Sequence, residues 1–260
     1  MSETSFIKEC VAMKRFCGML CWSGLCLSVL VPAFAADPVK VAEIISVEDL
    51  VTEVKDRVEK LKESTASEEA FKKAVADKMV GRDAGILAVA AQGLVEHDKG
   101  KDAGISAASL RDAAVVLRRA KTQVEAKAAV DKAVAALEGK GDAAAVAEHP
   151  WSKLTGMHAM MGEIEARQTK LRGALAKPRN LARDSRHASL IALLSVAMEE
   201  DTHEVKKPEE IPQWKALAKE YRDTMSQISV AMKAGDGAKA NELFKTSGKS
   251  CTVCHEKFRD

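Results

Sequence analysis

Apolar residues in the C-terminal part of the chain recur three and four positions apart, which is the spacing of one helix face. Two long runs have this spacing, 154–175 and 211–232, and two shorter runs lie at 187–198 and 240–258. Short polar segments separate the runs, and the prolines fall between runs or at their starts. Four amphipathic helices joined by short turns predict an antiparallel four-helix bundle in this part of the chain.

The preceding part of the chain repeats this pattern in a degenerate form. Asp49–Leu61 aligns with Ala159–Leu171 at an offset of 110, with Glu, Arg, Lys and Leu identical. Ala84–Asp98 aligns with Ala188–Thr202 at an offset of 104, with matching apolar positions. Because helical sequence rich in Ala, Lys and Glu also aligns with itself by chance, both duplication and coincidence stay open.

These patterns predict an all-α protein made of two consecutive antiparallel four-helix-type bundles. The first bundle is expected over residues 36–145 and the second over 146–260. Gly-Lys-Gly-Asp and then His-Pro interrupt the helical pattern between Gly139 and Pro150, where we place the boundary.

The stretch Phe16–Ala36 has no charged residue, follows Lys14 and Arg15, and ends in Pro-Ala-Phe-Ala. A basic start, a short apolar core and a small-residue cleavage site predict a secretory signal peptide over residues 1–35. Met13 would open such a signal conventionally and is the expected start of translation. An uncleaved membrane anchor is the alternative, but the glycines, the proline and the small-residue ending favour cleavage.

Composition excludes several classes of protein. The chain has 40 basic and 38 acidic residues, so it does not bind nucleic acid through bulk charge. Only 4% of its residues are aromatic and β-branched residues are sparse, which disfavours an all-β or Rossmann-type fold. The sequence lacks a Walker-type loop, GxSxG and HExxH, and no general acid/base pair points to an enzyme.

Cysteine positions indicate the chemistry. Four of the six cysteines precede residue 36, so the mature chain would keep only Cys251 and Cys254. They belong to Cys-Thr-Val-Cys-His, the signature of covalent c-type haem attachment. On a helix, positions i, i+3 and i+4 share one face, so two thiols could bind the haem vinyl groups while His255 coordinates the iron. The sequence therefore predicts one covalent haem c.

Two other uses of these cysteines fit less well. A disulfide between positions i and i+3 of a regular helix has unfavourable geometry, and the α/β pattern of a thioredoxin-type protein is absent. A zinc site would need further Cys or His ligands at finger spacing, and the other histidines show none.

The ending KSCTVCHEKFRD, after a Gly235-Asp236 turn and a helix containing Leu243-Phe244, resembles the C-terminal helix of the cytochrome c prime family and its six-coordinate, low-spin relatives. The resemblance covers residues 151–260. It implies an antiparallel four-helix bundle with the haem motif near its C-terminus.

The same resemblance implies roles for two further residues. Arg259, four positions after the histidine, would lie beside the proximal face of the haem, and Met157 in Met-His-Ala-Met would be the sixth iron ligand. Methionines at this spacing are also common core residues, and His158 is an alternative ligand. The chain departs from the family at Lys153, where an arginine is common, and in having residues 37–150 at all.

These observations predict a periplasmic electron-transfer cytochrome with His255 and Met157 as axial ligands. One alternative is a five-coordinate haem that binds a small gas such as nitric oxide or carbon monoxide. Another is an N-terminal interaction module beside a structural haem. The first bundle has no cysteine and could pack on the second, dock a redox partner or pair two subunits into a homodimer. No nucleic acid or stable membrane insertion is expected after signal cleavage.

Overall fold

A computed structural model of the chain describes residues 39–141 and 149–259. The expected signal peptide over residues 1–35 and the boundary at 145/146 lie outside these ranges. All regular elements within the described ranges are helices, which confirms the predicted all-α class. The described residues belong to one compact unit, Pro38–Asp260.

Residues 39–141, called here the N-terminal half, form six α-helices and one short 3₁₀ segment. They are α1 (Val41–Ile44), α2 (Val47–Thr65), α3 (Glu68–Ala76), α4 (Met79–Glu96), η1 (Gly100–Ala103), α5 (Ala107–Leu117) and α6 (Gln123–Leu137). Helices α2, α4, α5 and α6 pack around one another, because α4 contacts α2 and α5 while α6 contacts α5 and α2.

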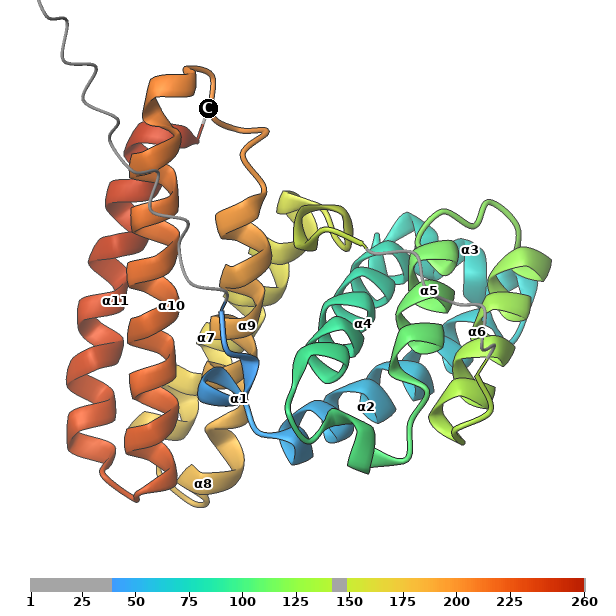
Figure 1. Cartoon of the computed structure of the whole chain (residues 1–260), viewed down its shortest axis with the longest axis horizontal. Coiled ribbons are helices and arrows are strands. Elements are labelled where there is room, and N and C mark those ends of the chain that lie inside the picture. The colour runs from blue at the N-terminus through green and yellow to red at the C-terminus, as the bar shows by residue number, and fades with distance from the viewer. Residues whose placement is uncertain (1–38, 142–148, 260) are drawn as a thin grey trace, which may run out of the picture. The chain divides into compact units, whose positions relative to one another are not determined.

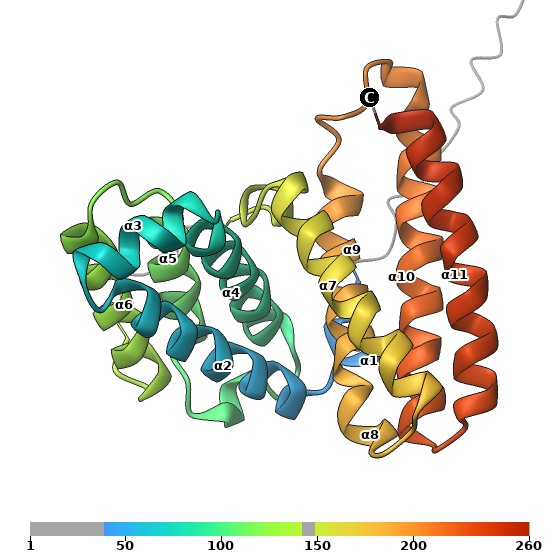
Figure 2. The same ribbon diagram turned by 180° about the vertical axis from the view of Figure 1, so that it is seen from behind.

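Residues 149–259, called here the C-terminal half, follow a similar order. They form η2 (Trp151–Lys153), α7 (Met157–Ala176), α8 (Leu181–Asp184), α9 (Arg186–Glu200), η3 (Pro208–Glu210), α10 (Ile211–Lys233) and α11 (Gly237–Phe258). Helix α10 packs extensively on α9 and α11, and α7 packs on α9, whereas α7 and α11 touch only sparsely (Figures 1 and 2). The predicted runs at 187–198 and 240–258 correspond to α9 and α11.

Local side chains define where several of these helices begin. Ser46 accepts a hydrogen bond from the backbone N–H of Asp49 at the start of α2, and Thr122 forms a reciprocal capping box with Glu125 at the start of α6. The side chain of Asp236 accepts a hydrogen bond from the backbone N–H of Lys239 at the start of α11, directly after Gly235 turns the chain with a φ of 78°. These caps satisfy backbone donors that a helix leaves free at its first turn.

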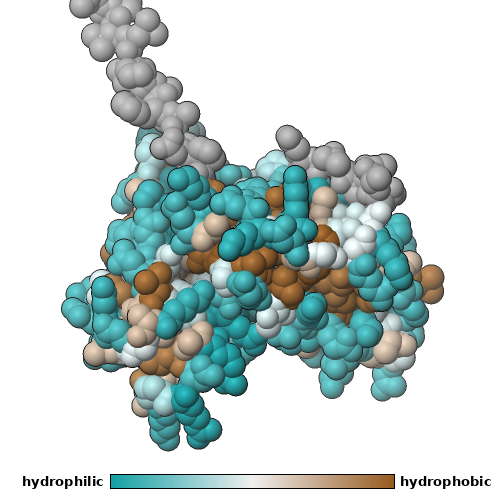
Figure 3. All heavy atoms as spheres, turned by 60° about the horizontal axis from the view of Figure 1, so that its bottom comes forward, coloured by the Kyte–Doolittle hydropathy of each residue, from teal (hydrophilic) through white to brown (hydrophobic). Residues whose placement is uncertain are grey.

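The two halves share one continuous core of buried apolar side chains. Helix α4 of the N-terminal half contacts α7 and α9 of the C-terminal half, and α1 contacts α9. Figure 3 shows apolar side chains gathered along the middle of one face, between hydrophilic areas. Within the described ranges, no helix is both long and apolar enough to cross a membrane.

Candidate functional site

Helix α11 positions the Cys-Thr-Val-Cys-His segment in its last two turns. Cys251 and Cys254 are half-buried and pack against the core, and Phe258, one turn later, is buried. Each residue of an α-helix advances by about 100°, so these three side chains lie within about 60° of one another. His255 lies at the edge of this face and is exposed. Its role as an iron ligand stays a prediction.

The thiol of Cys251 lies beside a polar pair formed by α7 and α10. The amide nitrogen of Gln168 donates to the hydroxyl of Tyr221 at 2.8 Å and lies 3.7 Å from the Cys251 Sγ. Burial and the neighbouring Cys251 raise the pKa of Tyr221, and burial and Cys251 raise the pKa of Cys254. The phenol and the Cys254 thiol are therefore held in their neutral forms.

The surroundings of these thiols fit a large apolar group. Only three residues of α11 are buried, although Leu243, Phe244, Cys251 and Cys254 share an apolar face. The half-covered face lies on α11, which touches α7 only sparsely. The donor set and its surroundings therefore fit a haem attached between α7 and α11.

Met157 is the first residue of α7, and its side chain is buried. It lies eleven residues before Gln168, a rise of about 16 Å along the helix. His158 is exposed, and Met160 is fully buried. The structure thus places Met157 inside the C-terminal half but shows no pairing of its sulfur with His255, and its role as a ligand stays a prediction.

Arg259 directly follows α11. Its backbone N–H donates to the carbonyl of His255 at 3.1 Å, and the residue is exposed. Trp214 and Tyr221 of α10 are buried, and the Trp214 ring meets Phe258 edge-on at 5.2 Å. The C-terminal turn is thereby anchored to α10.

The alternative chemistries of the two cysteines receive no support from the described residues. Both thiols are free, and no group of three His, Cys, Asp or Glu side chains in the described ranges is arranged to hold a metal ion. A zinc site would need such a group. Haem attachment needs only the two thiols and one imidazole from the protein.

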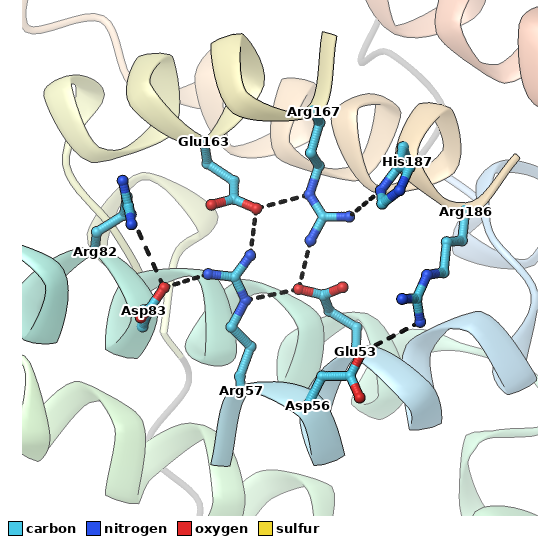
Figure 4. Close-up of polar contacts among 9 residues, drawn as sticks. All are labelled: Glu53, Asp56, Arg57, Arg82, Asp83, Glu163, Arg167, Arg186 and His187. Atoms are coloured by element: carbon cyan, nitrogen blue, oxygen red, sulfur yellow. Dashed lines mark hydrogen bonds and ion pairs between the residues drawn. The ribbon is translucent and has the colours of Figure 1, made fainter. Parts of the chain in front are cut away.

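A second polar site, which the sequence analysis did not predict, lies between the halves (Figure 4). This ionic cluster consists of Glu53, Arg57, Asp83, Glu163, Arg167 and His187. The two arginines and three carboxylates are all at most 5% exposed. Charges on amphipathic helices usually face solvent, but here α2 and α7 bury them against each other. The identity of these Glu and Arg positions in the two aligned segments was the signal in the sequence.

The pKa values in the cluster follow from burial and pairing. Burial opposes ionisation of Glu53, but Arg167 and Arg57 outweigh it and lower its pKa to about 2. His187 accepts a hydrogen bond from Arg167, and burial together with Arg167 lowers its pKa to about 4. At neutral pH, Glu53 is therefore ionised and the imidazole of His187 is neutral.

Comparison with known proteins gives no relative. No protein-family model, no curated protein and no solved structure matches the chain.

Proposed function

We propose that this protein is a periplasmic c-type cytochrome of the cytochrome c prime type that transfers single electrons through one haem bound to Cys251 and Cys254. The observation that carries the proposal is the Cys-x-x-Cys-His segment on the half-covered apolar face of α11. In this proposal each half is a four-helix bundle, and only the second holds haem. The order and packing of α7, α9, α10 and α11 support that arrangement.

In this proposal, some residues attach the haem, and others coordinate its iron and influence its reduction potential. Cys251 and Cys254 would fix the haem edge to α11, and His255 would coordinate the iron from the same helix. When bound, the haem supplies a one-electron couple between ferric and ferrous iron. The buried side chains of Trp214 and Phe258 exclude water at the end of α11. Met157 would close the second axial position and favour a relatively high potential.

The second candidate function is gas binding by a five-coordinate haem. It is favoured by one observation: Met157 is buried at the start of α7, three turns from the level of Gln168, so it could serve as apolar packing beside an open iron site. In the electron-transfer proposal, His255 and Met157 instead fill both axial positions. The spin state of the iron separates these two functions.

Covalent attachment is tested by expressing the full chain with a haem-attachment system in the bacterial periplasm. We expect an intact mass of the chain from near Ala36 plus one haem, because only Cys251 and Cys254 remain after cleavage. Cys251→Ser/Cys254→Ser, which keeps both side chains small, should lose the haem mass. Cys26→Ser is the matched control and should keep it. A mature chain without haem, or one that retains residues 1–35, would contradict the proposal.

A further inference from the structure

The ionic cluster contains two equivalent Glu-Arg pairs, one from each half. Helix α2 carries Glu53 and Arg57, and α7 carries Glu163 and Arg167, in positions that the offset of 110 makes equivalent. Within each helix the arginine Nε donates to its own glutamate Oε1 at 2.7 Å. Each half therefore presents a Glu-Arg pair of the same geometry to the other.

The bonds between the halves are reciprocal, atom for atom. Nη2 of Arg57 donates to Oε1 of Glu163, and Nη2 of Arg167 donates to Oε1 of Glu53 at 2.6 Å. The remaining Nη1 of each arginine bonds within its own half. That of Arg57 bonds Asp83 on α4, and that of Arg167 bonds His187 on α9. Asp83 and His187 are themselves related by the offset of 104.

A second pair of contacts, away from the ionic cluster, also links corresponding segments of the two halves crosswise, with donor side chains at non-equivalent positions. The side chain of Arg118, at the end of α5, donates to the backbone carbonyl of Lys153 at 3.1 Å. The side chain of Ser226, on α10, donates to the backbone carbonyl of Glu43 at 3.3 Å. Residues 43 and 153 are again 110 apart, and α5 and α10 follow α4 and α9 in their respective halves.

In a two-fold, isologous interface between identical subunits, each contact occurs twice: residue i of the first subunit meets residue j of the second, and residue j of the first meets residue i of the second. Helices α4 and α9, which occupy equivalent positions in the two halves, pack against each other, as helices near a two-fold axis do. An ordinary contact between unrelated domains has no reason to show this reciprocity. The alignment at two offsets and the contacts therefore support duplication over coincidence.

We infer that the face of the C-terminal half formed by α7 and α9 is a self-complementary dimer surface, and that the N-terminal half is the built-in partner that occupies it. The intact chain is then a covalent pseudo-dimer and is monomeric in solution. This inference concerns an interaction surface and does not depend on haem attachment.

The test replaces residues 142–148 of the full chain by a protease site and cleaves after folding. The two halves should stay together as a 1:1 complex in native mass spectrometry. The inverted variant carries Glu53→Arg, Arg57→Glu and Asp83→Lys, which keeps the pairs within the N-terminal half but sets like charges against Arg167 and Glu163. The cleaved complex should then weaken by at least about 100-fold. The released C-terminal halves should form homodimers, because their surface is unchanged.

The matched control adds Glu163→Arg and Arg167→Glu to the inverted variant, so that opposite charges face each other again. This fully inverted protein should regain the 1:1 complex. The inference is overturned if the inverted variant stays as a 1:1 complex, if the fully inverted one does not regain it, or if released C-terminal halves remain monomers.

A milder set of variants covers the case in which the inverted chain does not fold. Double-mutant cycles pair Glu53→Gln with Arg167→Gln, and Glu163→Gln with Arg57→Gln, in the uncut protein. In both of these pairs, each of which links the two halves, the substitutions should be coupled by at least tenfold in the equilibrium constant of unfolding. The exposed pair Lys127–Asp131 serves as a control with little coupling. Coupling in only one of the two pairs that link the halves would contradict the reciprocal arrangement.

Discussion

Glu53 and Glu163 are buried carboxylates that stay ionised because each accepts hydrogen bonds from two guanidinium groups. Moving such charges out of water is unfavourable, and only close pairing with good geometry offsets it. Removal of a single partner would leave an uncompensated buried charge, which typically destabilises by about 3–5 kcal/mol. At the scale of residues, the contact between the halves therefore depends on a complete set of partners.

His187 makes the stability of the protein depend on pH. Its pKa is lowered from 6.5 to about 4 by burial and by the neighbouring Arg167, Lys170 and Arg186, which outweigh Glu53. Between pH 4 and pH 6.5 the unfolded chain binds more protons than the folded one. The contribution of His187 to the free energy of unfolding is therefore complete above pH 6.5 and is lost as the pH falls towards 4. We expect a loss of about 1–2 kcal/mol between pH 7 and 4.5, after allowance for solvent screening.

Urea unfolding at a series of pH values measures this dependence. His187→Gln, which can still accept a hydrogen bond from Arg167, is the matched variant and should flatten the profile over this range. A wild-type profile parallel to that of the variant would show that another group titrates instead. Glu53 loses its contribution only below its ordinary pKa of 4.5. Glu200 and His203, whose pKa values are raised, also titrate above 4.5 but are unchanged in His187→Gln, so the difference between the two profiles isolates His187.

Met157 decides between the two proposed functions at the level of one side chain. If its thioether binds the iron, the wild-type holoprotein is mainly low-spin and binds carbon monoxide weakly or slowly in the ferrous state. Met157→Ala should then become high-spin and bind the gas readily. Met160→Ala, a fully buried methionine on the same helix, is the control and should leave the spin state unchanged. A wild-type protein that is already high-spin would favour the gas-binding function.

At the scale of elements, α11 differs from the other long helices because so little of it is buried. It contacts α10 closely and α7 sparsely, and its apolar face is only half-covered. The stability of a helix in a protein comes mostly from packing of its apolar face. Without a group on this face, the C-terminal turns of α11 are expected to open more readily than those of α10.

Hydrogen exchange tests this expectation. In Cys251→Ser/Cys254→Ser, which cannot attach haem, backbone amides in the last three turns of α11 should exchange at least about tenfold faster than in the haem-loaded protein. Amides of α6 in the N-terminal half should exchange at equal rates in both proteins and serve as the internal control. Equal protection of α11 in both proteins would show that this helix needs no further partner.

The sequence predicted the helices of the C-terminal half because their apolar periodicity is strong, and it predicted Cys251, Cys254 and His255 from one spacing. The buried side of α7 was less predictable. The apolar spacing of the run 154–175 did not indicate that the polar residues Glu163 and Arg167 would be buried, yet the structure buries both. A helix that packs on two sides has no single apolar stripe, so its periodicity does not reveal which polar residues are buried.

At the scale of the whole molecule, the two halves form one compact unit with a shared core. The N-terminal half contributes three members of the ionic cluster and contacts α7 and α9, whereas helix α11 lies on the far side of the C-terminal half (Figure 2). A haem between α7 and α11 and a partner half on α7 and α9 can therefore be present together. The architecture separates the surface that binds the other half from the site of the proposed redox chemistry.

The two Glu-Arg pairs that link the halves also determine the order in which the hydrogen bonds of the ionic cluster form during folding. Arg57 and Glu163 are 106 residues apart in the chain, and Glu53 and Arg167 are 114 apart. During synthesis, α2 emerges long before α7, so its Glu and Arg have only each other and Asp83 as partners until the second half is made. Contacts of such long sequence separation form late in folding. The ionic cluster of the N-terminal half therefore lacks its partners until the C-terminal half has been made. The C-terminal half, which carries the cysteines, is expected to fold last.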